Sequence, residues 1–186
     1  MEYVDNKICN YVKQRLLRIT VGVTAIMLVM SLLSSCTIGR TKHMVDFKYS
    51  RGANARMIII KYIGKGGDVV IPSKIGAPVA SIDEGAFSGC KNMTSVKIPN
   101  SIIIINDHSF STCTGLTSII LPNSIHKVWD NAFSGCKNLH SVYFEGAAPE
   151  LGKNVFAGTP SDFTIYYHAG KEGWSNNWNG YYTATY

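Results

Sequence analysis

The sequence predicts an α/β solenoid, a fold in which one short structural unit is repeated and stacked. Several ladders of residues recur at the same interval of 23 residues. They are Phe87, Phe110, Phe133 and Phe156; Cys90, Cys113 and Cys136; Pro99 and Pro122; Ile82, Ile105, Val128 and Leu151; and Val96, Ile119, Val142 and Ile165. A unit of this size cannot bury an apolar face alone, so each copy must stack on its neighbours and share one core.

The repeated unit combines a short strand with a turn. Residues 116–121 alternate as a strand does, which predicts that Leu116, Ile119 and Leu121 point inward and that Ser118 and Ile120 point outward. Asp130–Phe133 predicts a short helical turn on the opposite wall, with Phe133 directed into the core. About four repeats follow from this register, at residues 73–98, 99–121, 122–144 and 145–167.

Two flanking segments depart from the period, and each is predicted to cover one end of the stack. Residues 46–72 contain three β-branched runs separated by glycine-rich turns, which predicts an N-terminal β-hairpin cap. Residues 168–186 contain two Trp and three Tyr, and such side chains bury a large area. We interpret this tail as a C-terminal cap. A carbohydrate platform is the alternative, because aromatic faces also stack on sugars.

The N-terminal region is typical of an export signal. Four basic residues precede an uncharged run at residues 19–33, whose 15 residues fall short of the ~20 that a membrane-spanning helix needs. Leu33-Ser34-Ser35-Cys36 resembles the bacterial lipobox, whose cysteine receives a diacylglyceryl group. Residues 1–35 are predicted to be a lipoprotein signal peptide, and residues 36–45 the lipidated Cys36 and its tether. A generic signal peptide and an uncleaved anchor are the alternatives.

Composition and motifs favour binding over catalysis. Beyond the signal peptide the chain has 14 Lys and Arg and 10 Asp and Glu, without a basic run, so a nucleic-acid partner is not indicated. Common catalytic motifs are absent, and the five His residues never recur at a metal-ligand spacing. Asp107, His108 and Ser109 are interpreted as turn residues and not as a triad. We therefore expect no enzyme activity, metal or cofactor.

The three periodic cysteines are predicted to be buried, unlinked thiols. Side chains at one repeat position all point the same way, which is a poor arrangement for the dihedral angle of a disulfide. A disulfide is the competing interpretation, because an exported protein meets an oxidising compartment.

Written as Leu-x-x-Ile-x-Leu-Pro-x-Ser-Ile-x-x-Val-x-x-x-Ala-Phe-x-x-Cys-x-x, the unit resembles the BspA-type leucine-rich repeat family. The resemblance covers residues 58–180 and includes an exit at Phe156–Pro160 and at Gly173-Trp174. It implies a right-handed superhelix with a concave parallel sheet, on exported bacterial proteins of which some are adhesins for host matrix proteins. The chain departs from the family in having few repeats and in carrying Thr159 where other repeats have Cys.

The same register predicts where a ligand would bind. Parallel strands lie ~4.8 Å apart, so outward positions of successive repeats should form columns. One column is Lys97, Ile120, Tyr143 and Tyr166, and a second is Ser95, Ser118, Ser141 and Thr164. The alternative interpretation is that these residues have no binding role, since β-branched and aromatic residues are common in strands.

These observations together predict the function and location. The expected protein is a lipid-anchored, non-catalytic module of the bacterial cell envelope, at the outer membrane or cell surface, that binds a protein or polysaccharide. A structural or accessory protein that docks other envelope components is the alternative.

Overall fold

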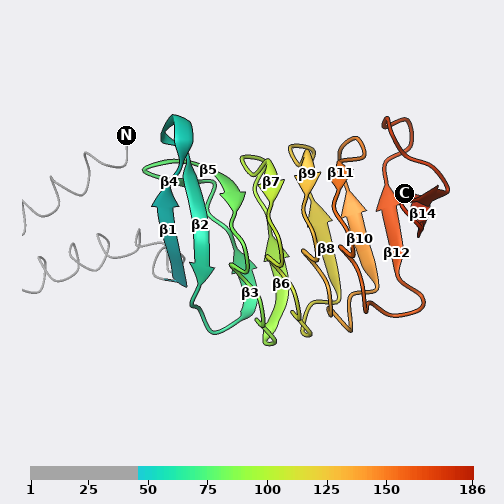
Figure 1. The fold of residues 1–186 in the computed structure, drawn as a ribbon, viewed down its shortest axis with the longest axis horizontal. Helices are drawn as coiled ribbons and strands as arrows, with labels where there is room; N and C mark the ends of the chain where they lie inside the picture. Colours follow the sequence, from blue (N-terminus) through green and yellow to red (C-terminus); the bar gives the residue numbers. More distant parts are fainter. Residues whose placement is uncertain (1–45) are drawn as a thin grey trace, which may run out of the picture. The chain divides into compact units, whose positions relative to one another are not determined.

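The computed structural model describes residues 46–186, which form a solenoid of about five turns. The predicted solenoid with a parallel sheet is therefore confirmed (Figure 1). The predicted signal peptide at 1–35, Cys36 and the tether to residue 45 lie outside the described residues. Within residues 46–186, no helix is long and apolar enough to cross a membrane.

One wall of the solenoid, here called the main sheet, has seven strands in the order β13-β14-β12-β10-β8-β6-β3. All neighbouring pairs are parallel except β13 with β14. Its strands are β3 (Gly67–Val70), β6 (Met93–Lys97), β8 (Ser118–Leu121), β10 (Ser141–Phe144), β12 (Thr164–Tyr167), β13 (Asn177–Trp178) and β14 (Tyr181–Thr185). Val142 pairs with Ile119 and with Ile165, so the strands follow the 23-residue register seen in the sequence.

The opposite wall is a second sheet, with long strands at its N-terminal end and two-residue strands in the later turns. Its central pairs β2–β5, β5–β7, β7–β9 and β9–β11 are parallel, and β1 closes its N-terminal edge as an antiparallel partner of β2. The strands are β1 (Phe47–Arg51), β2 (Met57–Tyr62), β4 (Lys74–Ile75), β5 (Ala77–Ile82), β7 (Ile104–Ile105), β9 (Lys127–Val128) and β11 (Glu150–Leu151). Among residues 47–186 the helical content is one 3₁₀ turn, η2 (Ala53–Ala55).

The helical turn expected at Asp130–Phe133 is instead a tight turn between the two sheets. Asn131 has a φ of 55°, a left-handed conformation that stops a right-handed helix from forming. The N–H groups of Asn131 and Phe133 donate to the carbonyls of Lys153 and Val155, at 2.9 Å each. Backbone groups that a helix would pair internally therefore join neighbouring turns of the solenoid.

The N-terminal hairpin is present, and its second strand also belongs to the repeating structure. β2 is antiparallel to β1 but parallel to β5, and β3 is parallel to β6. Val69 pairs with Val96, 27 residues later. This spacing is longer than the 23-residue period because extra residues are inserted near β4. The ladders of residues 23 apart therefore do not extend into the first turn of the solenoid.

A column of stacked phenylalanine rings runs through the core. Ring centroids lie 4.8 Å apart for Phe87–Phe110, 5.1 Å for Phe110–Phe133 and 5.5 Å for Phe133–Phe156, with planes within 15° of parallel. Tyr62 continues the stack at its N-terminal end, 5.3 Å from Phe87. All four phenylalanines are fully buried, so the column forms a continuous apolar axis along which the turns are stacked.

Tail aromatics close the other end of the core. The ring of Tyr181 meets Phe156 edge-on at 5.3 Å, and Trp178 is buried against Phe144. The indole N–H of Trp174 donates to the carbonyl of Gly146 at 3.2 Å. These contacts confirm the aromatic cap at the C-terminal end, and a carbohydrate platform would require the same indole rings to be exposed.

The cysteine ladder lies beside the phenylalanines, and its three members are free thiols. Cys113 and Cys136 are buried as predicted, and their thiols donate to the carbonyls of Phe87 and Phe110 at 3.1 Å each. The neighbouring Cys136 and Cys90 thiols, together with burial, raise the pKa of Cys113, which therefore stays protonated. Cys90 is only half-buried, because its turn lies next to the N-terminal end.

Removing one ring from the middle of the phenylalanine column should destabilise the whole solenoid. Phe110→Ala leaves a cavity between Phe87 and Phe133, and we expect the free energy of unfolding to fall by about 3–5 kcal/mol in urea titrations. The exposed strand residue Ile120 provides the control, since Ile120→Ala should cost about 1 kcal/mol or less. At Phe156 the loss should be smaller than at Phe110, because the terminal cap can shift into the space. An unchanged unfolding midpoint for Phe110→Ala would show that this core register is wrong.

Candidate binding surface

The main sheet brings the predicted binding residues into one straight column. Lys97 lies opposite Ile120, Ile120 opposite Tyr143, and Tyr143 opposite Tyr166. Val70 extends this column at one end, where it pairs with Lys97. Ile120 is 56% exposed, which leaves it free to contact a partner.

The tyrosines of the column form a compact aromatic group. The rings of Tyr143 and Tyr166 are stacked at 4.9 Å and 12°. Tyr186 meets Tyr143 edge-on at 5.3 Å, and its ring also lies 4.3 Å from the ring of His168. The sequence columns did not reveal Tyr186 and His168, because both lie in or beside the tail, where the period has ended. The available signal was the high aromatic content of that tail.

The phenol of Tyr186 is a neutral hydrogen-bonding group. Partial burial, and then the nearby Glu145 carboxylate and Tyr143, raise its pKa. The ring therefore keeps its O–H donor at neutral pH. The backbone N–H of Tyr186 donates to the carbonyl of Tyr167 at 3.2 Å. This hydrogen bond holds Tyr186 against the main sheet.

The second predicted column, of small hydroxyl residues, is present as well. Ser141 lies opposite both Ser118 and Thr164. Ser95 stands at the N-terminal end, where its hydroxyl donates to Asp68 at 2.7 Å. Ser95 and Ser118 are both exposed, and Ser95 is the one whose hydroxyl is engaged by Asp68. The small side chains leave the neighbouring Ile and Tyr column accessible from the side.

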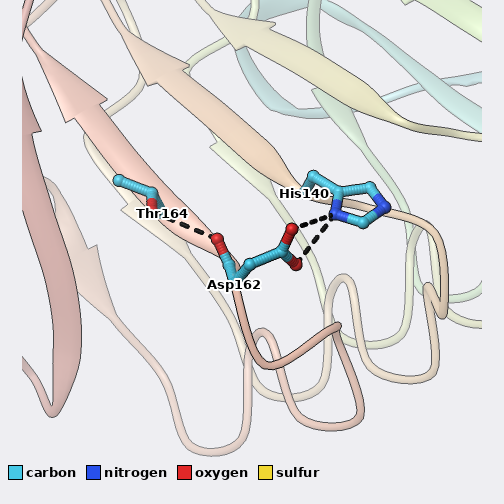
Figure 2. A network of polar contacts seen from close by, with 3 residues as sticks. All are labelled: His140, Asp162 and Thr164. Carbon is cyan, nitrogen blue, oxygen red and sulfur yellow. Dashed lines mark hydrogen bonds and ion pairs between the residues drawn. The ribbon is translucent and has the colours of Figure 1, made fainter.

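An exposed histidine–aspartate pair flanks the hydroxyl column, as Figure 2 shows. His140 precedes β10, and its Nδ1 lies 2.9 and 3.0 Å from the two carboxylate oxygens of Asp162. Thr164 donates its hydroxyl to the Asp162 backbone carbonyl at 3.2 Å. The two partners are 22 residues apart, one short of the repeat, so no ladder of residues 23 apart contains both. An exposed pair of this kind adds little stability, but it places two polar groups beside the column.

Asp107, His108 and Ser109 do not form a catalytic triad. Ser109 is fully buried, and its hydroxyl donates to the backbone carbonyls of Asp83 and Asn106 at 3.0 and 2.6 Å. His108 is exposed in a left-handed turn conformation. The hydroxyl therefore completes the hydrogen bonding of the turn. In the part of the chain from residue 46 onward, no three His, Cys, Asp or Glu side chains are placed to hold a metal ion.

Solved structures share this architecture. A leucine-rich repeat protein from T. pallidum is 27% identical, with a TM-score of 0.57 over 66% of this chain and 69% of its own. A leucine-rich repeat protein from Bacteroides capillosus is 22% identical, with a TM-score of 0.60 over 67% of this chain and 95% of its own. A third, from Bacteroides ovatus, is 23% identical, with a TM-score of 0.52 over 68% of this chain and 37% of its own.

Family-level similarity rests on the repeats themselves. No relative among curated protein sequences matches the chain. The family model described as BspA type leucine-rich repeat region matches residues 68–172, in six copies. This range runs from the second residue of β3 to beyond β12 and includes every residue of the two predicted columns. More than half of the chain is thus accounted for, and the protein belongs to the BspA-type leucine-rich repeat family.

Proposed function

We propose that this protein is a lipid-anchored, non-catalytic binding module of the bacterial cell envelope, and that its main sheet contacts the ligand. The observation that supports this proposal is the in-register column of Lys97, Ile120, Tyr143 and Tyr166. Tyrosine is enriched at interfaces and at their energetic centres. An exposed Ile next to stacked Tyr rings offers the apolar contact that such a centre needs.

A protein ligand fits this surface better than a flat sugar does. Sugars stack on open aromatic faces, but Tyr143 and Tyr166 cover one face of each other, and Tyr186 packs against Tyr143. The remaining surface combines ring edges, hydroxyl groups and the Ile120 side chain, which is the mixture found at protein interfaces. A polysaccharide ligand is an outcome that the binding test below can reveal.

The envelope location rests on the N-terminal motif and on the family. Leu33–Cys36 has the order of the lipobox, and acyl chains contribute ~0.8 kcal/mol per buried methylene, so several chains hold a protein firmly on a membrane.

Truncating the two stacked tyrosines should remove ligand affinity while the fold persists. We expect Tyr143→Ala with Tyr166→Ala to weaken binding at least tenfold, since truncating a tyrosine at the energetic centre of an interface costs about 2 kcal/mol or more. Binding is measured by surface plasmon resonance against fibronectin, fibrinogen, collagen, isolated envelope proteins and purified envelope polysaccharides. Circular dichroism confirms that the variant is folded.

The matched control is Lys137→Ala with Lys153→Ala. Both lysines are exposed and lie in turns outside the main sheet, so their removal should leave affinity unchanged. Equal affinity of the folded tyrosine variant and the parent would contradict the proposed surface. Capture of envelope proteins alone, without any matrix protein, would favour the accessory role over the adhesin-like one.

Lipid attachment has its own test. Mass spectrometry of the membrane fraction should find a chain that begins at an acylated Cys36, and Cys36→Ala should release the protein from membranes. Ser35→Ala is the control, because a small residue remains before the cysteine. An unacylated parent, or a Cys36→Ala variant that stays on membranes as the parent does, would contradict the anchor.

A further inference from the structure

Basic residues are concentrated at the N-terminal end of the solenoid. Residues 46–66 contain five Lys and Arg and one acidic residue, whereas residues 98–186 contain four Lys and Arg and six acidic residues. The five are Lys48, Arg51, Arg56, Lys61 and Lys65, and all are exposed. In Figure 1 the β1–β2 hairpin that carries most of them forms one end of the stack, with β14 at the other. The molecule is therefore electrically polar along the solenoid axis.

These charges lack acidic partners within the described chain. The ion pairs found among residues 46–186 are Lys127–Glu150 and His140–Asp162, neither of which involves this end. Lys48 lies directly opposite Lys61 in the β1–β2 ladder, and like charges in that relation destabilise a hairpin. An external anion would relieve this repulsion, so the arrangement favours contact with a negatively charged partner.

Exposed apolar side chains accompany the basic ones. Tyr49, Ile60 and Ile63 are 42%, 37% and 54% exposed. The Ile63 N–H donates to the carbonyl of Asp46 at 2.8 Å, which fixes Ile63 beside the point where the chain enters the solenoid. Basic and apolar side chains exposed on the same structural element are typical of proteins that rest on the interface of an anionic bilayer.

The length of the preceding chain brings this end close to the membrane. This step rests on the proposed function, in which Cys36 carries the lipid. Nine residues, 37–45, separate Cys36 from Asp46, and a chain of that length spans at most ~30 Å. The hairpin is the part of the solenoid to which this tether is joined, so it can reach the headgroups, where its charge is attractive over a Debye length of about 8–10 Å.

We infer that the N-terminal end of the solenoid is a docking surface for anionic phospholipid headgroups. The basic residues bind the phosphates, and Tyr49, Ile60 and Ile63 enter the interfacial layer. Docking in this way orients the solenoid with its N-terminal end on the membrane and leaves the Tyr143–Tyr166 column on the wall that rises from it. The anchor holds the protein at the membrane, and the docking surface sets its orientation.

The test uses the full chain with a genetically encoded dansyl residue at position 63 or, as the distal reporter, at the exposed position 182. The chain is reconstituted with vesicles of phosphatidylcholine and phosphatidylglycerol in which the acyl chains are brominated. We expect bromine quenching and a blue shift at position 63 but not at position 182. Both effects should disappear in pure phosphatidylcholine and in about 0.5 M NaCl, because salt screens the attraction.

Charge reversal provides the matched comparison. Lys48→Glu, Arg51→Glu and Lys65→Glu together should reduce quenching at position 63 about tenfold or to the level at position 182, since each basic residue adds to headgroup attraction. Lys137→Glu, Lys153→Glu and Lys171→Glu change the net charge equally at exposed distal sites and should leave the quenching intact.

Three results would overturn the docking surface. They are equal quenching at both positions, quenching that survives the first charge reversal, and a response at position 63 to soluble dextran sulfate but not to anionic vesicles. Mass spectrometry of the same sample reports whether Cys36 is acylated. If it is not, the same quenching measurement is made after the unacylated chain is added to preformed vesicles. Failure of the anchor and failure of the docking surface are therefore separate outcomes.

Discussion

The stacking of one phenylalanine ring per turn is the interaction on which the rest of the structure depends. Phe87, Phe110, Phe133 and Phe156 keep centroid distances of 4.8–5.5 Å, close to the spacing of parallel strands. A ring at each level sets the rise of the solenoid, and both sheets then pair without a change of register between these turns. A slip by one residue would turn every strand side chain to the opposite face. The register that fills the core therefore also determines which side chains are exposed to solvent.

The outer surface follows from this inner constraint. Because Val142 pairs with Ile119 and Ile165 inside the core, Tyr143 must lie between Ile120 and Tyr166 outside it. The caps complete the arrangement, since Tyr62 and Tyr181 close the ring column while Tyr186 joins the outer tyrosines. The C-terminal tail thus serves the core and the proposed binding surface at once, which connects the stability of the last turn to the shape of that surface.

Much of this could be predicted from the sequence, since a repeat places equivalent residues at equivalent positions. The buried ladders and the two outward columns needed only the period. The second sheet and its tight turns could not be read in the same way, because two-residue strands such as β9 show no alternation, and left-handed residues such as Thr112 vary between repeats. Tyr186 and the His140–Asp162 pair also escaped, since their contacts depend on where the tail and a 22-residue spacing depart from the period.

The central claim is that one register fixes both the phenylalanine core and the tyrosine surface. Nuclear Overhauser measurements on the isotope-labelled protein test it most directly. The account predicts cross-peaks between the rings of Phe110 and Phe133 and, in the same sample, between the rings of Tyr143 and Tyr166. Cross-peaks for the first pair without the second, or contacts between Tyr143 and the buried Phe133 ring, would contradict it.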